Sequence, residues 1–134
     1  VQGQAHRTAR LRSALRSHVA ILADVAVKHA APLAQRPLEL EVLDLVERGC
    51  VDGIIVSGDR TGGAVSIETL NEVSHHSNKP VYIGSGTTPD RLPELISAAD
   101  GFIIGSYFKH EGNPLRTVNE DRVKEMMTTW QSLQ

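Results

Sequence analysis

The chain has 134 residues, of which 40% are hydrophobic, 22% charged and 4% aromatic, a composition typical of a globular α/β protein rather than of a disordered segment. Fourteen basic against sixteen acidic residues leave a net charge of -2, which argues against nucleic acid or anionic lipid as a partner. No apolar stretch approaches the roughly 20 residues of a membrane-spanning helix. The single cysteine, Cys50, favours a reducing compartment, so we expect the cytoplasm, or an organellar matrix in a eukaryote. Cys50 itself is expected to be a small core residue.

The first part of the chain predicts a helix, a strand, a helix and a second strand. Residues 4–18 have the spacing of an amphipathic helix, and the β-branched apolar run 19–27 is typical of a strand covered on both faces. Residues 38–48 form the next predicted helix, closed by Gly49, and residues 51–57 the next strand. The outer face of the first helix is expected to carry Arg7, Arg10, Arg12 and Arg16.

The second part repeats this alternation. A helix over 66–75 is expected to begin at the cap Ser66, and a strand over 80–86 precedes a helix opened by Thr88 and Pro89. Residues 101–106 predict a fourth strand, and Asn119 opens a last helix. Strict alternation of strands and helices without a linker predicts α/β architecture with parallel (β/α) units in one domain, or part of one, over residues 1–134.

The carboxyl end of the first predicted strand carries Asp24 and Lys28. Period-two alternation would place both on one face, where functional groups gather in parallel α/β proteins. There the pair could handle protons on a substrate, with Lys28 as a general base or Schiff-base amine. An ion pair filling the interior of a barrel is the alternative.

The other three strand ends are rich in glycine and hydroxyl groups. Ser57 and Asp59 follow the second strand and could contact a ligand, although a solvated turn is the alternative. Gly84, Ser85 and Gly86 follow the third strand, and Gly105 with Ser106 the fourth. Glycines let backbone amides approach an anion, so these two ends predict a phosphate site, with tight strand-to-helix turns as the alternative.

No metal site is predicted, and the sequence identifies no cofactor. His29 and His110 both follow strand ends and could meet across the rim, but their long spacing makes a metal site only a hypothesis.

Four segments together closely resemble the carboxyl-terminal half of the BtpA/SgcQ family: Ala23–Ala34, Asp52–Gly62, Gly84–Pro89 and Ala99–Lys109. The resemblance covers essentially the whole chain and implies half of a TIM (β/α)8 barrel, with these strands as strands five to eight. A full barrel needs about 250 residues, so the length fits half of one. By matching position, the resemblance carries over Asp24, Lys28, His29, Ser57, Asp59, Gly84 to Gly86, Gly105 and Ser106 as site residues.

Two functions compete. The first is an enzyme of unknown reaction that binds a small phosphorylated metabolite, sugar-like or nucleoside-like. The second is a non-catalytic assembly factor that uses the barrel surface, as the family's role in photosystem I biogenesis implies. In either case a four-stranded half barrel exposes two edges, so we expect a homo-oligomer or pairing with a missing amino-terminal half barrel.

Overall fold

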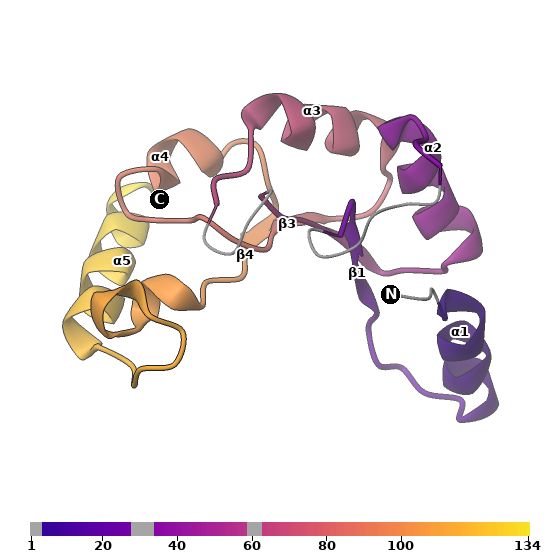
Figure 1. The fold of residues 1–134 in the computed structure, drawn as a ribbon, viewed down its shortest axis with the longest axis horizontal. Coiled ribbons are helices and arrows are strands. Elements are labelled where there is room, and N and C mark those ends of the chain that lie inside the picture. Colours follow the sequence, from indigo (N-terminus) through magenta and orange to yellow (C-terminus); the bar gives the residue numbers. More distant parts are fainter. Residues whose placement is uncertain (1–3, 28–33, 59–62) are drawn as a thin grey trace.

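The computed structural model describes residues 4–27, 34–58 and 63–134. Four parallel strands lie in chain order, each hydrogen-bonded to the next, as β1-β2-β3-β4. In Figure 1 the chain forms an open arch, with α2, α3 and α4 along its convex side and α1 and α5 at its two ends. The elements are α1 (Ala5–Ala14), β1 (Leu22–Val25), α2 (Leu38–Leu43), continuing as π-helix η1 (Asp44–Arg48), β2 (Gly53–Val56), α3 (Ile67–His76), β3 (Val81–Ile83), α4 (Leu92–Leu95), β4 (Gly101–Phe102), the 3₁₀ turns η2 (Ser106–Phe108) and η3 (His110–Gly112), and α5 (Glu120–Ser132).

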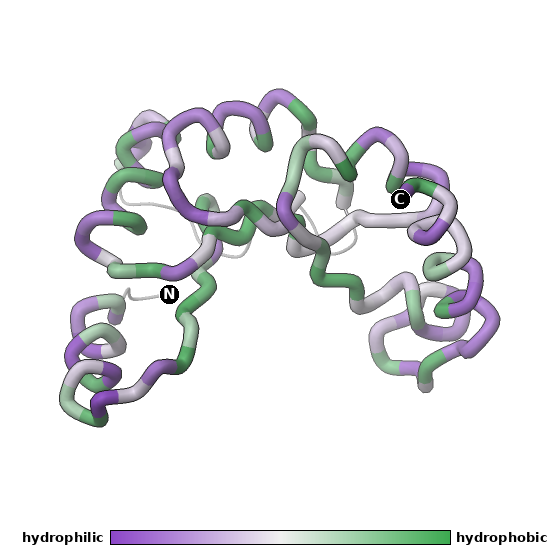
Figure 2. The backbone as a smooth tube through the Cα atoms, turned by 180° about the vertical axis from the view of Figure 1, so that it is seen from behind, coloured by the Kyte–Doolittle hydropathy of each residue, from purple (hydrophilic) through white to green (hydrophobic). Residues whose placement is uncertain are grey.

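The hydrophobic core lies between the sheet and the helices on its convex side. Ile54 and Ile83 point from neighbouring strands into this layer and are fully buried. They pack with residues contributed by three helices, which accounts for the buried apolar residues at alternate positions of β2. Figure 2 shows the same gathering of hydrophobic segments along the strands. The helix residues in this core are Val42, Leu70, Val73 and Leu95.

The concave face of the sheet is only partly covered. Asp24 and Leu22 face this side of β1 and are exposed. Tyr82 lies two strands away on β3, in register with Asp24 through Ile55 of β2. The Tyr82 ring spreads over two glycines of the neighbouring strands: a Cβ on Gly53 or Gly101 would lie 2.8 Å from a ring carbon. The absence of side chains at these glycines therefore lets Tyr82 lie flat across the sheet.

The first strand is shorter than the sequence predicts. We expected residues 19–27, but β1 covers only Leu22–Val25. Just before β1, the Ile21 N–H donates to the Asp52 carboxylate at 2.8 Å and not to the backbone of a neighbouring strand. Just after β1, Ala26 adopts a φ of 53°. A residue with left-handed backbone angles interrupts the alternation of side chains between the two faces of a strand. The prediction that this alternation continues beyond Val25 was therefore wrong.

Two further boundaries differ from expectation. The strand expected over 101–106 has only two residues, Gly101 and Phe102. The helix expected from Thr88 begins at Leu92. Residues 88–91 form a turn in which the Thr88 carbonyl accepts from Arg91 N–H at 3.1 Å, and Pro93 has no N–H with which the next helical bond, to the Pro89 carbonyl, could form. Ser66 and Asn119 cap α3 and α5 as predicted, each accepting from the first turn of its helix.

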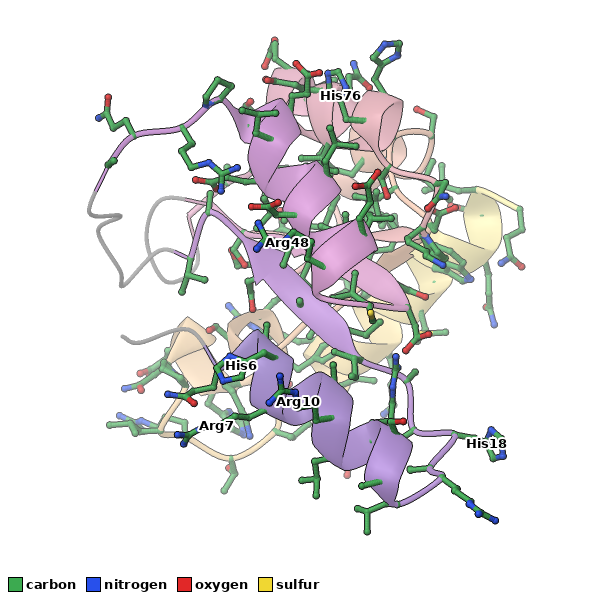
Figure 3. All side chains as sticks on the ribbon, turned by 90° about the vertical axis from the view of Figure 1, so that its right-hand side faces the viewer. His6, Arg7, Arg10, His18, Arg48 and His76 are labelled. Carbon is green, nitrogen blue, oxygen red and sulfur yellow. The ribbon has the colours of Figure 1, made fainter. Side chains whose placement is uncertain are left out.

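The first helix also differs from its predicted form. It ends at Ala14, so Arg16 lies beyond it, and Arg12 does not face outward. The Arg12 guanidinium pairs with the Asp52 carboxylate and donates to the Cys50 carbonyl at 2.7 Å. Figure 3 shows Arg7 and Arg10 extending from α1. Arg12 thus attaches α1 to the segment just before β2.

Cys50 was wrongly expected in the core. It is exposed, with a φ of 53°, and follows a helix end at which Gly49 keeps an ordinary helical φ of -75°. Gly49 is needed instead for close approach, because a Cβ there would lie 2.7 Å from the Leu45 carbonyl oxygen. The left-handed turn that ends the helix is therefore one residue later than the sequence predicts.

In the part of the chain that the structure describes, no helix is both long enough and apolar enough to cross a bilayer. The compartment and the single-domain organisation stay predictions.

Candidate functional site at the carboxyl ends of the strands

Asp24 and Ser57 meet at the carboxyl ends of β1 and β2. The Ser57 hydroxyl donates to the Asp24 carboxylate, with Oγ and Oδ1 3.2 Å apart. Asp24 is in register with Ile55, and Ser57 follows Ile55 by two residues, so the side chains of Asp24 and Ser57 lie on the same, concave face. A carboxylate that is open to solvent and hydrogen-bonded to a hydroxyl can accept a proton or orient a polar substrate group.

Three of the predicted site residues, Lys28, His29 and Asp59, lie outside the described residues. Their roles stay predictions. The strand alternation that placed Asp24 and Lys28 on one face ends at Val25, so that geometric reason for pairing them does not hold.

Gly84 makes room for Ser57. A Cβ on Gly84 would lie 2.7 Å from Ser57 Oγ and 2.5 Å from a methyl carbon of Ile55. Its own N–H donates to the Val56 carbonyl at 2.8 Å, which extends the β2–β3 ladder to the rim. Gly84 therefore keeps the concave side of the Asp24–Ser57 pair free of a neighbouring side chain.

Ser85 and Gly86 join two adjacent loops. The Ser85 hydroxyl accepts from Gly58 N–H at 3.1 Å and donates to the Gly63 carbonyl at 3.4 Å. Gly86 has a φ of 76°, and a Cβ there would lie 2.3 Å from the Gly63 oxygen. Both residues thus position the loop that follows β2, a role that the sequence did not predict for them.

Arg91 strengthens the same junction. Its guanidinium donates to the Val65 carbonyl at 3.0 Å and to the Gly86 carbonyl at 3.5 Å. No sequence pattern pointed to Arg91, because its main partner is 26 residues away in the chain. Thr87, inside this junction, is buried, and its hydroxyl has no partner among the residues that the structure places.

Backbone N–H groups with no described acceptor line two adjacent strand ends. Those of residues 85–88 follow β3, and those of residues 104–107 follow β4. Because Ile103 N–H donates to the Ile83 carbonyl at 2.8 Å, the chain leaves β4 directly beside β3. Gly105 is open, with no atom within 4 Å of a Cβ built on it, and Ser106 begins the η2 turn. Backbone amides at the carboxyl ends of parallel strands are groups that bind anions in proteins.

The loop after β4 is held against α5 by a cluster that the sequence did not reveal. The Tyr107 hydroxyl donates to the Glu125 carboxylate at 2.5 Å, and Arg122 stacks over the Tyr107 ring at 5.1 Å. Arg122 also donates to the carbonyls of Tyr107 and Lys109, at 3.0 and 3.2 Å. These contacts fix the backbone within η2 and directly after it.

The pKa of Tyr107 provides a direct test of this cluster. Burial, and secondly the bond to Glu125, raise the pKa of the Tyr107 phenol to about 12. The protonated Tyr107 phenol therefore stabilises the folded state. This contribution to the free energy of unfolding is complete below pH 10, the ordinary pKa of tyrosine, and is lost as the pH rises toward 12. Glu125→Gln removes the charged acceptor and should lower this pKa, measured by phenolate absorbance in a Tyr82→Phe background that leaves one tyrosine. An unchanged titration in Glu125→Gln would show that the bond does not form in solution.

Across residues 4–27, 34–58 and 63–134, no three His, Cys, Asp or Glu side chains come together as a metal site. His110 lies 3.3 Å from the Asn119 amide, and His75 packs edge-on against His76. His29, with which His110 was expected to meet, lies outside the described residues.

Comparison with known proteins identifies both family and fold. The BtpA family model matches residues 1–132. The chain is 46% identical over 125 residues to the Photosystem I biogenesis protein BtpA of Synechocystis sp., covering 92% of this chain and 43% of the relative. An uncharacterized protein of Thermococcus kodakarensis is 41% identical, with coverages of 95% and 48%. The chain thus spans about half the length of the curated relatives it matches.

A solved structure, phosphoribosyl anthranilate isomerase from Thermus thermophilus, is similar with a TM-score of 0.62 and 15% identity, covering 99% of this chain and 70% of that one. This likeness confirms the predicted α/β fold of parallel (β/α) units as half of a TIM barrel. With a family model matching nearly its whole length, the chain belongs to the BtpA family.

Proposed function

We propose that this protein binds a small phosphorylated metabolite, sugar-like or nucleoside-like, at the carboxyl ends of its strands. The observation that supports this most directly is the pair of adjacent amide runs, residues 85–88 and 104–107, for which no described residue supplies an acceptor. A phosphate group has several acceptor oxygens and could take hydrogen bonds from both runs at once. Gly105, with no atom near it, leaves the approach to the second run open.

The residues of the predicted phosphate site divide into two roles in this proposal. Gly105 and Ser106 belong to the amide run that contacts the phosphate, and Gly84 leaves space beside it. Ser85 and Gly86 act mainly as positioning residues, because the Ser85 hydroxyl already bonds Gly58 and Gly63.

The reacting part of the ligand would lie over the Asp24–Ser57 pair. Asp24 would accept or return a proton, and Ser57 would orient the carboxylate through their 3.2 Å hydrogen bond. We keep Lys28, His29 and Asp59 as further candidates, because they follow the same strand ends in the sequence. This division, with a phosphate anchor on two strands and proton-handling groups on the other two, is the basis for proposing an enzyme.

An assembly role is the second candidate, supported by one observation. The relative from Synechocystis sp., 46% identical to this chain, is called a photosystem I biogenesis protein. A barrel used only as an assembly surface would have no need of the Asp24–Ser57 pair, so this role predicts that changes at the rim are harmless.

Thermal unfolding in the presence of phosphorylated metabolites separates the two candidates. A true ligand at about 100 times its Kd stabilises the folded state by about 2.7 kcal/mol, which raises the Tm measurably. Asp24→Asn and Lys28→Met should abolish turnover of that ligand, whereas an assembly role would survive both changes. If no phosphorylated compound raises the Tm, the enzyme proposal loses its support.

A further inference from the structure

The Asp24–Ser57 pair presents only hydrogen-bond acceptors to a ligand. A serine hydroxyl has one proton, and Ser57 uses it in the bond to Asp24 Oδ1, 3.2 Å away. What remains free is a set of lone pairs on Ser57 Oγ and on the carboxylate oxygens of Asp24, which is exposed. The part of a ligand that binds here must therefore supply donors, as adjacent hydroxyl groups do.

Gly84 fixes the position of this pair relative to β3. A Cβ on Gly84 would lie 2.7 Å from Ser57 Oγ, so the hydroxyl lies against β3 at the level of residue 84. Gly84 and Ile103 each donate an N–H to the preceding strand at 2.8 Å, which keeps β2, β3 and β4 aligned up to this level. The pair therefore lies just before the two amide runs, residues 85–88 and 104–107, begin.

The geometry of the strands gives the length of a ligand that reaches both places. The middle of each amide run is two residues beyond the level of Gly84 and Ile103. Since an extended chain rises about 3.3 Å per residue, a phosphate on the two runs is about 7 Å from the pair. A covalent chain advances roughly 1.2 Å per bond, so about six bonds separate the phosphorus from the oxygen that binds the pair.

We propose, on the basis of the phosphate site proposed above, that the ligand is the phosphate monoester of a polyhydroxyl chain of about five carbons. Asp24 and Ser57 accept hydrogen bonds from two adjacent hydroxyls of this chain, one of them about six bonds from the phosphorus. The 2-hydroxyl of a pentose 5-phosphate is at this position. Glycerol 3-phosphate also has two adjacent hydroxyls, but both are closer to the phosphorus and would stop short of the pair.

The test is isothermal titration of this chain with four compounds that differ in length or in one hydroxyl: inorganic phosphate, glycerol 3-phosphate, 2-deoxyribose 5-phosphate and ribose 5-phosphate. Ribose 5-phosphate should bind at least about tenfold more tightly than its 2-deoxy analogue, because it makes one more hydrogen bond to a charged group. Glycerol 3-phosphate should bind no more than about threefold more tightly than inorganic phosphate, because its hydroxyls do not reach the carboxylate.

Asp24→Ala shows whether the pair is the group that recognises the hydroxyls. It should abolish the preference for ribose 5-phosphate over the 2-deoxy compound. Its effect on inorganic phosphate should stay within about threefold, because a charge about 7 Å away in water contributes no more than that. Glu72→Ala is the matched control: it removes the same charge from an exposed position of α3, on the convex side (Figure 1), and should leave the preference unchanged.

Equal affinities for ribose 5-phosphate and its 2-deoxy analogue would overturn the inference. So would glycerol 3-phosphate binding as tightly as ribose 5-phosphate, or a preference that survives Asp24→Ala. In each of these outcomes the compounds still bind and Gly105→Asp still weakens them, so the proposed phosphate site stands. If neither inorganic phosphate nor any of the three esters binds, the proposed function fails, and this inference fails with it.

Discussion

Replacing Gly86 with alanine is expected to destabilise the folded chain by about 3 kcal/mol. Two effects add. A residue with a Cβ at a φ of 76° costs about 1 to 2 kcal/mol, and the new carbon would lie 2.3 Å from the Gly63 oxygen, which forces the two loops apart. Urea unfolding should show a lower midpoint with an unchanged slope.

Gly105→Ala is the control for this change. Gly105 has a φ of -116°, and a Cβ there meets no atom within 4 Å. The free energy of unfolding of Gly105→Ala should therefore stay within about 0.5 kcal/mol of that of the unchanged chain. If the two alanine variants unfold at the same urea concentration, the close contact between the loops does not exist in solution.

Gly105→Asp is expected to reduce phosphate-ligand affinity by at least about tenfold while leaving the fold intact. The open space at Gly105 accepts the side chain, and its carboxylate would stand beside the amides of residues 104–107, where the phosphate is proposed to bind. Isothermal titration with the compound that gives the largest Tm rise measures the loss.

Gly105→Asn separates charge from size, because asparagine has the same shape without the negative charge. It should retain most of the affinity at low salt, and added salt should narrow the gap between the two variants. Equal losses in both would mean that Gly105 is needed for space and not for an anion, which contradicts the phosphate proposal.

Local signals in the sequence were sufficient for most of the fold. Ser66 and Asn119 begin their helices as expected, because a cap is decided by atoms two or three residues apart. The apolar run 51–57 likewise predicts a strand, and β2 forms within it over Gly53–Val56. The start of β1 was wrong because a distant partner decides it: Asp52, 31 residues further along the chain, binds the Ile21 amide just before β1.

The sequence predicted at which strand ends polar side chains lie, but not which of them touch. The rule that functional groups gather at the carboxyl ends of parallel strands placed Asp24 and Ser57 at neighbouring strand ends, where the structure shows them hydrogen-bonded, and their roles as site residues stay predictions. The same rule could not show that Ser85 holds a loop, since its two bonds depend on how close the chain comes at Gly63. Arg91 and Arg122 escaped notice because both act through backbone carbonyls, which carry no sequence pattern.

The order of the strands has a consequence for how the chain folds. Each strand of the sheet pairs only with its neighbour in sequence, so no contact within the sheet has to wait for remote segments to meet. The entropic cost of forming the sheet is therefore divided into single loop closures, each spanning one connecting helix. Folding can then begin at the β2–α3–β3 unit, where the fully buried Ile54 and Ile83 lie, and extend outward in both directions.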